Sequence, residues 1–270
     1  MTRDKISVFT NGTDVSDKVF HKLKKILEDH DHHVVPHYSG DSDLIVCIGG
    51  DGAFLETMHK CDFPTCPIVG INTGHLGFFQ EFLPDKLEDF IQAYEKKQYS
   101  LQQLNTVRCT VSTHAGEKFS HIGLNEIAIK GGNSFSVHLF ISIDGKPIEK
   151  FSGDGILVAT SAGSTAYNYS LGGSIADPRL KLLQVTPIAP MNTTAYRSFT
   201  SSILLPSDLS IGVVPEGDEN EIRILNDGIE TEYENVKNIQ VTASDQVVNL
   251  IRFKDYDFWH KVKDKFLETN

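Results

Sequence analysis

The sequence predicts an α/β N-terminal domain with a parallel, Rossmann-like sheet, then a mostly-β C-terminal domain and a C-terminal helix that packs back onto the body. Over residues 1–100, apolar strand patterns alternate with amphipathic helix patterns, an order typical of βαβ units. Over residues 101–253, short alternating or β-branched runs are separated by turn signals such as Asp144-Gly145 and Asp227-Gly228. We therefore expect domains at 1–100 and 101–253, with a helical tail at 254–270.

The N-terminal domain is predicted from two kinds of apolar periodicity. Lys5–Thr10 alternates as a strand does, whereas apolar residues recur at helical spacing from Asp14 to His30. Leu44–Ile48 is an unbroken apolar run, typical of a strand buried on both faces, and Pro67–Ile71 is expected to be the next strand. A second amphipathic helix is expected from Pro84, in its first turn, to about Lys97.

The C-terminal domain is predicted to consist of strands in a sandwich-like arrangement, without internal repeats or a low-complexity linker. The tail at Tyr256–Leu267 carries apolar residues at helical spacing and is expected to be a short helix. The strand patterns lie at Thr106–Thr113, His121–Lys130, Val137–Ile143, Ile156–Thr160, Ile203–Leu205, Ser210–Val214, Glu221–Leu225, Asn238–Ala243 and Val247–Phe253.

The composition excludes several classes of partner. With a net charge of −11 over 270 residues and no visible basic patch, the chain is not expected to bind nucleic acid. No apolar run approaches the roughly 18 residues needed to span a bilayer, and the N-terminus carries no signal-peptide pattern. The four cysteines are expected to be reduced thiols rather than disulfides or a zinc site. Together these features predict a cytoplasmic globular protein that does not bind membranes.

The run Gly49-Gly50-Asp51-Gly52 follows the buried strand and precedes a helix pattern. A strand, a glycine turn and a helix N-terminus place backbone N–H groups around a small anion, usually phosphate. Because a carboxylate in that turn repels phosphate, Asp51 is explained by holding a metal ion or by taking a proton from an attacking hydroxyl. The alternative is an ordinary strand-to-helix turn in which Asp51 is the helix N-cap. This stretch alone does not decide between the two.

Two further stretches carry polar groups of chemical interest. Asn125-Glu126 lies inside an apolar strand pattern, and burying both side chains is costly unless they find partners, such as ligand hydroxyls. The alternative is a strand-end glutamate that faces water. Residues 160–173 follow the glycine turn Ser152–Gly155, are rich in small hydroxyl residues, and include Tyr167 and Tyr169, which can stack on a base. By composition alone, residues 160–173 also fit an ordinary loop, and Asp154 also fits a plain turn residue.

Several familiar motifs are absent. Gly50-x-Gly52 lacks the third glycine of the dinucleotide fingerprint, and Asp51 stands where the pyrophosphate would approach, which disfavours a hydride-transferring enzyme. Gly163-Ser164-Thr165 lacks the lysine of a P-loop, and no Gly-x-Ser-x-Gly elbow is present for acyl transfer.

A set of short motifs occurs between about residues 40 and 230. They are Gly49-Gly50-Asp51-Gly52, Asn72-x-Gly74-x-Leu76-Gly77-Phe78, Asn125-Glu126, Asp154-Gly155, and Gly163-Ser164-Thr165-Ala166-Tyr167 with Ser170-x-Gly172-Gly173. In order and spacing this combination resembles the NAD kinase family. The first motif is shared with diacylglycerol, sphingosine and phosphofructo-kinases, whereas the Asn-Glu pair and the Gly-Ser-Thr-Ala-Tyr loop together are specific. The resemblance implies transfer of the γ-phosphoryl group of ATP to the 2′-hydroxyl of the adenosine ribose of NAD, giving NADP.

The resemblance also implies where the substrates bind. Asp51 would accept the 2′-hydroxyl proton or anchor a metal for the triphosphate, and Asn125 and Glu126 would hold the ribose hydroxyls and the diphosphate end. The adenine pocket would be lined by Thr165, Ala166, Tyr167 and Ser170, and the nicotinamide side by Asp154 and Ala189. The other implied contacts are Gly52, Phe78, Ser152, Ser164 and Asp227. Because family members are homo-oligomers, often tetramers, a homotetramer is expected.

The sequence departs from the family pattern on the phosphate side. Ala53 replaces the usual threonine after the glycine turn, Ser161-Ala162 replaces a Thr-Pro pair, and Ser152 stands at a position that is often basic. These departures leave open whether ATP or polyphosphate is the donor. Because no basic residue lies in the glycine turn, Mg²⁺ bound with ATP is expected to supply the positive charge.

Two alternative functions remain from the sequence. A lipid kinase of the same superfamily is disfavoured by Asn125-Glu126 and by the lack of a membrane-binding stretch. A non-catalytic NAD(P)-binding regulator would keep Tyr167 and Glu126 without needing Asp51, and Ala53 is its only support. The sequence does not decide between NAD and NADH as substrate, nor whether NADP feeds back on the enzyme.

Overall fold

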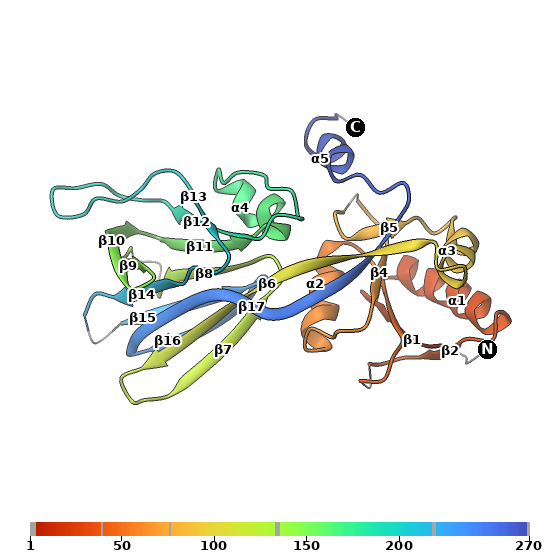
Figure 1. The fold of residues 1–270 in the computed structure, drawn as a ribbon. Helices are drawn as coiled ribbons and strands as arrows, with labels where there is room; N and C mark the ends of the chain where they lie inside the picture. The colour runs from red at the N-terminus through yellow and green to blue at the C-terminus, as the bar shows by residue number, and fades with distance from the viewer. Residues whose placement is uncertain (1–3, 39, 76, 133–135, 218–219, 269–270) are drawn as a thin grey trace. The chain divides into compact units, whose positions relative to one another are not determined.

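The computed structural model describes residues 4–38, 40–75, 77–132, 136–217 and 220–268, and the chain divides into two compact units (Figure 1). The first unit comprises Met1–Gln103 and Val247–Asn270, and the second comprises Leu104–Gln246. Two long strands, β6 (Tyr99–Thr113) and β17 (Val236–Phe253), carry the chain from one unit into the other. The domain boundaries predicted at residues 100 and 253 stay predictions. None of the helices formed by the described residues is both long and apolar enough to cross a bilayer.

The first unit is an α/β fold with a parallel sheet, as the sequence predicts. Its strands are ordered β2-β1-β3-β4, and both β5 and the end of β17 pair in parallel with β4. Besides the ends of β6 and β17, its elements are β1 (Lys5–Thr10), α1 (Asp14–Asp29), β2 (His33–Val35), β3 (Leu44–Ile48), α2 (Asp51–Lys60), β4 (Ile68–Ile71), β5 (Gln80–Phe82), α3 (Leu87–Glu95) and α5 (Phe258–Phe266).

Helix α1 and strand β3 show why this part of the sequence folds as it does. The hydroxyl of Thr13, the N-cap of α1, accepts a hydrogen bond from the backbone N–H of Ser16 at 3.3 Å, and the helix buries an apolar face. All five residues of β3 are buried, as expected for a central parallel strand. The carboxyl ends of β3 and β4 lead into the glycine turn and into the segment that starts at Asn72. This edge of an open α/β sheet is where ligands bind.

Two details of the first unit differ from the sequence prediction. The helix predicted from Pro84 begins at Leu87, because Pro84 lies in a turn that the Lys86 N–H closes on the Leu83 carbonyl at 3.0 Å. The three-residue strand β5 is not predicted, since so short a segment shows no alternation. Leu76, which belongs to one of the quoted motifs, lies outside the described residues.

The second unit is a sandwich of two antiparallel sheets, which confirms the mostly-β prediction. One sheet has the order β13-β12-β11-β8-β15-β16, and the other contains β10, β9, β14 and β17, together with β6 and β7. Buried side chains of both sheets form one core, for example Ile129 and Val158 with Val111 and Val241.

The elements that lie within the second unit are β7 (Lys118–Gly123), β8 (Glu126–Gly131), β9 (Val137–Ile143), β10 (Lys146–Gly153), β11 (Gly155–Thr160), the 3₁₀ turn η1 (Ala162–Thr165), α4 (Tyr167–Ser170), β12 (Leu182–Ile188), β13 (Ile203–Pro206), β14 (Ile211–Pro215), β15 (Glu221–Asn226) and β16 (Ile229–Glu234).

Two strand predictions in this unit are wrong in their boundaries. The run His121–Lys130 forms two strands, β7 and β8, because the backbone N–H groups of residues 124–126 donate to the Asp227 carboxylate rather than to a neighbouring strand. The runs Asn238–Ala243 and Val247–Phe253 form the single strand β17, which pairs with β6. Its polar middle is held by a hydrogen bond from Thr106 Oγ1 to the Gln246 carbonyl at 2.6 Å. Strand β12 is not predicted, since Pro187 interrupts the strand signal.

Candidate active site

Asp51 is the first residue of helix α2, at the carboxyl end of β3, and its carboxylate binds backbone N–H groups of a neighbouring segment. The Phe78 N–H donates to Oδ1 at 2.9 Å and to Oδ2 at 3.1 Å, and the Phe79 N–H donates to Oδ1 at 3.1 Å. Gly50, not Asp51, occupies the N-cap position of α2. Asp51 therefore does not cap its own helix, and its carboxylate is oriented by two backbone donors.

Gly77 allows the segment that carries these donors to lie against Asp51. A Cβ added at Gly77 would overlap both the Gln80 side-chain amide and Asp51 Oδ1. Gln80 is only 4% exposed, and neither polar atom of its side chain has a hydrogen-bond partner among the described residues. The sequence does not single out Gln80, because a lone glutamine carries no motif.

Helix α5 brings two lysines to this place in the first unit. Lys265 Nζ lies 3.8 Å from Asp51 Oδ2, and Lys261 Nζ donates to the carbonyl oxygens of Gly77, at 3.3 Å, and of Gln80. Burial lowers the pKa of Lys261 to about 8, although the carboxylates of Glu81 and Asp51 oppose this shift. The glycine turn itself contains no basic residue, as the sequence shows, but the fold of the first unit brings Lys261 and Lys265 close to Asp51.

Phe78 and Gly52 differ in their accessibility. Phe78 is 7% exposed, and its ring lies between Phe258 and Phe266 of α5, with centroid distances of 5.9 and 6.0 Å. Gly52 is exposed, with open space where a Cβ would be. Ala53 contributes its methyl group to the packing against Gly49, whose added Cβ would come within 2.5 Å of it.

In the second unit, Asn125 and Glu126 lie at the start of β8 and are held by Asp227. The Asp227 carboxylate accepts hydrogen bonds from the backbone N–H groups of Leu124, Asn125 and Glu126 at 2.7, 2.8 and 3.1 Å. Asp227 follows β15 with a positive φ of 48°, in the turn that precedes Gly228. Its carboxylate therefore orients the Asn-Glu pair through the backbone.

The polar side chains of this pair are buried and incompletely bonded. Asn125 is 5% and Glu126 8% exposed, so the alternative of a glutamate that faces water is wrong. Asn125 Oδ1 and Glu126 Oε2 have no hydrogen-bond partner among the described residues. Burial, and then the nearby charge of Asp227, raise the pKa of Glu126 to about 8. Buried polar atoms without a partner are rare in folded proteins, so both atoms call for a partner that the described residues do not supply.

The structure brings the Gly-Ser-Thr-Ala-Tyr loop against the Asn-Glu pair. The N–H of Thr160 donates to the Asn125 carbonyl at 2.9 Å, and its hydroxyl donates to the Leu124 carbonyl at 2.7 Å. A Cβ added at Gly163 would overlap the Asn125 carbonyl, so this glycine is needed for the close approach. The two motifs, distant in the sequence, therefore form one site.

The residues expected in the adenine pocket lie in η1 and α4. Ser164 is fully buried, and its hydroxyl both donates to the Ala176 carbonyl at 3.1 Å and accepts from the Ala176 N–H at 3.0 Å. Tyr167 packs against the small apolar cluster that includes Leu157 and Ile188. Thr165, Ala166 and Tyr167 are half-buried and Ser170 is exposed at the end of α4.

Asp154 and Ala189 lie together at one end of the β11–β12 pair. The Asp154 N–H donates to the Ile188 carbonyl at 3.0 Å, and Ala189 has a positive φ of 45°. Both residues are exposed, whereas Ser152 is 2% exposed and its N–H donates to Ser198 Oγ at 3.2 Å. Asp154 and Ala189 are thus accessible to a ligand, and Ser152 is part of the framework beneath them.

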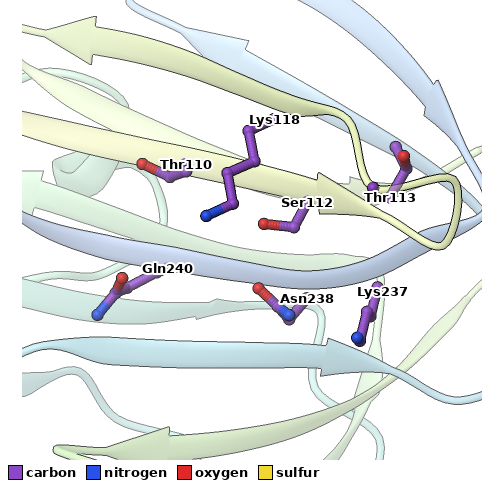
Figure 2. Close-up of a pocket in the computed structure, with 8 residues that line it drawn as sticks. Thr110, Ser112, Thr113, Lys118, Lys237, Asn238 and Gln240 are labelled. Atoms are coloured by element: carbon purple, nitrogen blue, oxygen red, sulfur yellow. The ribbon is translucent and has the colours of Figure 1, made fainter.

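A pocket in the second unit is lined by none of the predicted site residues. It measures about 300 Å³ and lies among polar side chains of β6, β7 and β17 (Figure 2). Its lining consists of Thr110, Ser112, Thr113, Gly116, Lys118, Lys237, Asn238 and Gln240.

Comparisons with known proteins identify the family of the chain. Residues 4–99 match the family model of the ATP-NAD kinase N-terminal domain, and residues 124–253 match that of the ATP-NAD kinase C-terminal domain. The chain is 41% identical to the NAD kinase of Finegoldia magna over 239 residues, which cover 86% of this chain and 87% of that protein. It is 31% identical to the NAD kinase of Geobacillus stearothermophilus over 264 residues, 97% of this chain and 96% of that one.

Two solved structures share the fold. The yeast NADH kinase in complex with NADH superimposes with a TM-score of 0.83 at 20% identity, covering 99% of this chain and 88% of that one. An NAD kinase from Archaeoglobus fulgidus in complex with ATP gives a TM-score of 0.75 at 25% identity, covering 96% and 98%. With both domain models matched in order, and with a 41% identical relative over most of its length, the chain belongs to the NAD kinase family.

Proposed function

We propose that this phosphotransferase moves the γ-phosphoryl group of ATP to the 2′-hydroxyl of the adenosine ribose of NAD, with Asp51 as the acceptor of the hydroxyl proton. The observation that carries the proposal is the pair of buried, unpartnered oxygen atoms Asn125 Oδ1 and Glu126 Oε2. A buried acceptor without a donor costs about 1–3 kcal/mol, so both atoms favour a ligand that brings hydroxyl groups.

Asp51 has the geometry that a proton acceptor needs. Its Oδ1 accepts from the backbone N–H groups of Phe78 and Phe79, whereas its Oδ2 accepts from that of Phe78 alone among the described residues. We assign Oδ2 to the ribose hydroxyl. In the transfer, the bond between the γ-phosphorus and the bridging oxygen of ADP breaks, a bond to the ribose 2′-oxygen forms, and the hydroxyl proton passes to Asp51.

Asn125 and Glu126 are assigned to the ribose hydroxyls and the diphosphate end of NAD. A carboxylate can accept from two hydroxyl groups, and an amide can both accept and donate. We assign Asp227 as a residue that positions Asn125 and Glu126, because its carboxylate accepts hydrogen bonds from the N–H groups of residues 124–126.

The remaining predicted contacts are divided by their accessibility. We assign the adenine pocket to the half-buried Thr165, Ala166 and Tyr167 with Ser170, and the nicotinamide side to Asp154 and Ala189. Gly52, whose surroundings are open, is assigned to the donor phosphates. Phe78, Ser152 and Ser164 are buried and already engaged, since the Phe78 ring packs on α5, the Ser152 N–H binds Ser198 and the Ser164 hydroxyl binds Ala176. We assign them to the walls that support these contacts.

Mg²⁺ remains the proposed cofactor, and the residues present fit it. Among the described residues no group of three or more His, Cys, Asp or Glu side chains gathers to hold a metal ion. Mg²⁺ commonly binds through one or two carboxylates together with substrate phosphates and water. Asp51, whose alternative role is that of a metal anchor, is the carboxylate at the glycine turn. When bound with ATP, the ion would neutralise charge on the phosphate oxygens.

The donor, the assembly and the compartment are proposed on separate grounds. We propose ATP as donor, with polyphosphate as the alternative that Ala53 leaves open.

A homotetramer follows from the family resemblance and is supported by exposed apolar side chains on adjacent strands, Phe140 and Val214, which are 44% and 43% exposed. The cytoplasm is proposed because all four cysteines are free thiols.

The proposed reaction is tested by incubating the purified chain with NAD, ATP and Mg²⁺ and identifying the product by ³¹P NMR. We expect one new phosphomonoester signal, that of a 2′-phosphate, formed together with one equivalent of ADP. Polyphosphate replaces ATP in a parallel sample, and ATP alone serves as control for hydrolysis. A product phosphorylated elsewhere, or no product from either donor despite saturable NAD binding, would overturn the proposal.

A further inference from the structure

One face of helix α5 lies against the segment that orients Asp51. Phe258, Lys261, Lys265 and Phe266 recur at the spacing of a single helix face. The two phenylalanine rings pack on Phe78, and Lys261 binds the carbonyl oxygens of Gly77 and Gln80. The helix is therefore fixed at both ends and in the middle, and this fixes the position of Lys265 as well.

Lys265 places a positive charge beside the proposed proton acceptor. Its Nζ lies 3.8 Å from Asp51 Oδ2 and 5.4 Å from the centre of the Phe78 ring. A separation of 3.8 Å is that of an ion pair without a direct hydrogen bond. The Lys265 side chain is 34% exposed and that of Asp51 is 26% exposed, so an anionic ligand can reach both groups from solvent.

Gln80 is a second, independent observation at the same place. Its side-chain amide is buried and has no hydrogen-bond partner among the described residues. Its Oε1 packs against Gly77, as Asp51 Oδ1 does, because a Cβ added at Gly77 would overlap both atoms. A primary amide brings two N–H donors. Because burying such a group without a partner is costly, its retention points to a ligand oxygen that accepts from it.

We propose that Lys265 and Gln80 form, beside Asp51, the binding site for the phosphoryl group that is being transferred. The inference rests on the proposed function, since it names the residues that contact the terminal phosphate of the donor. Lys265 attracts the equatorial oxygen atoms of that group, and the Gln80 amide donates a hydrogen bond to one of them. Neither residue gains or loses a proton in the step, because the hydroxyl proton goes to Asp51.

The physical effect of this arrangement is electrostatic. During phosphoryl transfer, negative charge is spread over three equatorial oxygen atoms, and fixed positive groups near them stabilise the transition state. In a protein of net charge −11, such help must come from a local charge rather than from the overall field. The glycine turn itself contains no basic residue, so Lys265 of helix α5 supplies the local positive charge.

The test compares Lys265→Met, Lys265→Arg and Gln80→Met with Lys263→Met. Lys263 belongs to the same helix but pairs with Glu268 at 2.8 Å, away from Asp51. For each variant we would measure kcat, KM for ATP, the Kd of NAD, the thermal unfolding temperature, and calorimetric binding of inorganic tripolyphosphate without Mg²⁺ or NAD. The last readout does not depend on turnover.

We expect Lys265→Met to lower kcat about 100-fold and Gln80→Met about tenfold, with NAD affinity unchanged. Lys265→Arg should restore most of the rate, and Lys263→Met should behave as the parent protein. Tripolyphosphate binding should weaken in Lys265→Met and stay intact in Lys263→Met. If Lys265→Met does not fold, Lys265→Arg and Gln80→Met carry the comparison.

Equal kcat and equal tripolyphosphate binding in Lys265→Met and Lys263→Met would overturn the inference. So would a parallel loss of NAD affinity and unfolding temperature, because that pattern belongs to a merely structural lysine. If the parent protein makes no NADP but binds tripolyphosphate through Lys265, the proposed function fails while the anion site stands. The two failures are therefore distinguishable.

Discussion

The surroundings of Glu126 raise the pKa of its carboxyl group well above the usual value for a glutamate. Its carboxyl group is 8% exposed at the start of β8 and lies near the charged Asp227, so its pKa rises to about 8. Asp227 cannot move away, because three backbone N–H groups bind it. The same contacts that orient Glu126 for a ligand therefore make its ionisation unfavourable in the ligand-free protein.

We predict that the ligand-free protein loses stability as pH rises from about 5 to 8 through this one group. In that range the folded state holds a proton on Glu126 that the unfolded chain has released, so the free energy of unfolding falls by about 1.4 kcal/mol per pH unit. Above pH 8 the loss is complete. Urea unfolding of Glu126→Gln against the parent protein measures the difference at each pH, and a difference that does not change with pH would contradict the prediction.

Gly163 connects the two motifs of the second unit. We predict that Gly163→Ala lowers the free energy of unfolding by about 1–3 kcal/mol, as overpacking does, and weakens NAD binding. The added methyl group overlaps the Asn125 carbonyl, which the Thr160 N–H holds in place. Chemical denaturation and calorimetry with NAD are the measurements. Gly74→Ala, where a Cβ meets nothing within 4 Å, serves as the stability control. Equal stability of both variants would show that the loop can move aside.

Single site residues were predictable from the sequence only where they interrupt a local pattern. Asn125-Glu126 stands out because two polar residues interrupt an apolar run, and the structure confirms that they are buried. Gln80 and Lys265 do not stand out, since each is an ordinary polar residue in its own segment. Their significance comes from their positions, Lys265 beside Asp51 and Gln80 against Gly77, and only the fold creates these positions.

Helix α5 and the end of β17 act as one element that supports the Asp51 region. Arg252, the second-last residue of β17, forms a buried ion pair with Glu81 and also donates to the Phe78 carbonyl at 3.2 Å. Its guanidinium group stacks on the Tyr256 ring at 3.7 Å. The segment that orients Asp51 is thus held by hydrogen bonds from both Arg252 and Lys261.

We predict that Arg252→Met lowers the free energy of unfolding by about 3–5 kcal/mol, because it leaves the Glu81 carboxylate buried without its charge partner. Glu81→Gln combined with Arg252→Met should recover part of that loss, since the unpaired Glu81 carboxylate is then removed. Urea unfolding of the two single variants and the double variant gives the coupling between the side chains. A double variant less stable than Arg252→Met would show that the other contacts of Arg252 matter more than the ion pair.

The elements themselves were predictable where they are long and periodic. Helix α1, with its threonine N-cap, and the buried strand β3 follow directly from the sequence. Strand β17 was divided in the prediction because Ser244 and Asp245 resemble a turn, whereas pairing with β6 keeps the backbone extended through them. Long-range pairing overrides local turn preference here, and a single sequence does not contain that information.

For the whole molecule, the assigned roles belong to different parts of the chain. Asp51, Lys265 and Gln80 belong to the first unit, whereas Asn125, Glu126 and the Tyr167 loop belong to the second. Phosphoryl transfer from ATP to a ribose hydroxyl requires a proton acceptor and a held acceptor substrate, and the proposed roles assign the first to one unit and the second to the other. Mutations in the two units should therefore have different kinetic signatures.

The measurement that tests this account most directly separates catalysis from binding in Asp51→Asn. The NADP-formation rate with NAD, ATP and Mg²⁺ would be measured beside the calorimetric Kd of NAD for the variant and the parent protein. We expect turnover to fall by a factor of at least about 100 while NAD affinity stays within about tenfold, because Asp51 acts in the chemical step. Undiminished turnover, or loss of NAD binding in a folded variant, would contradict the role of Asp51 as the proton acceptor.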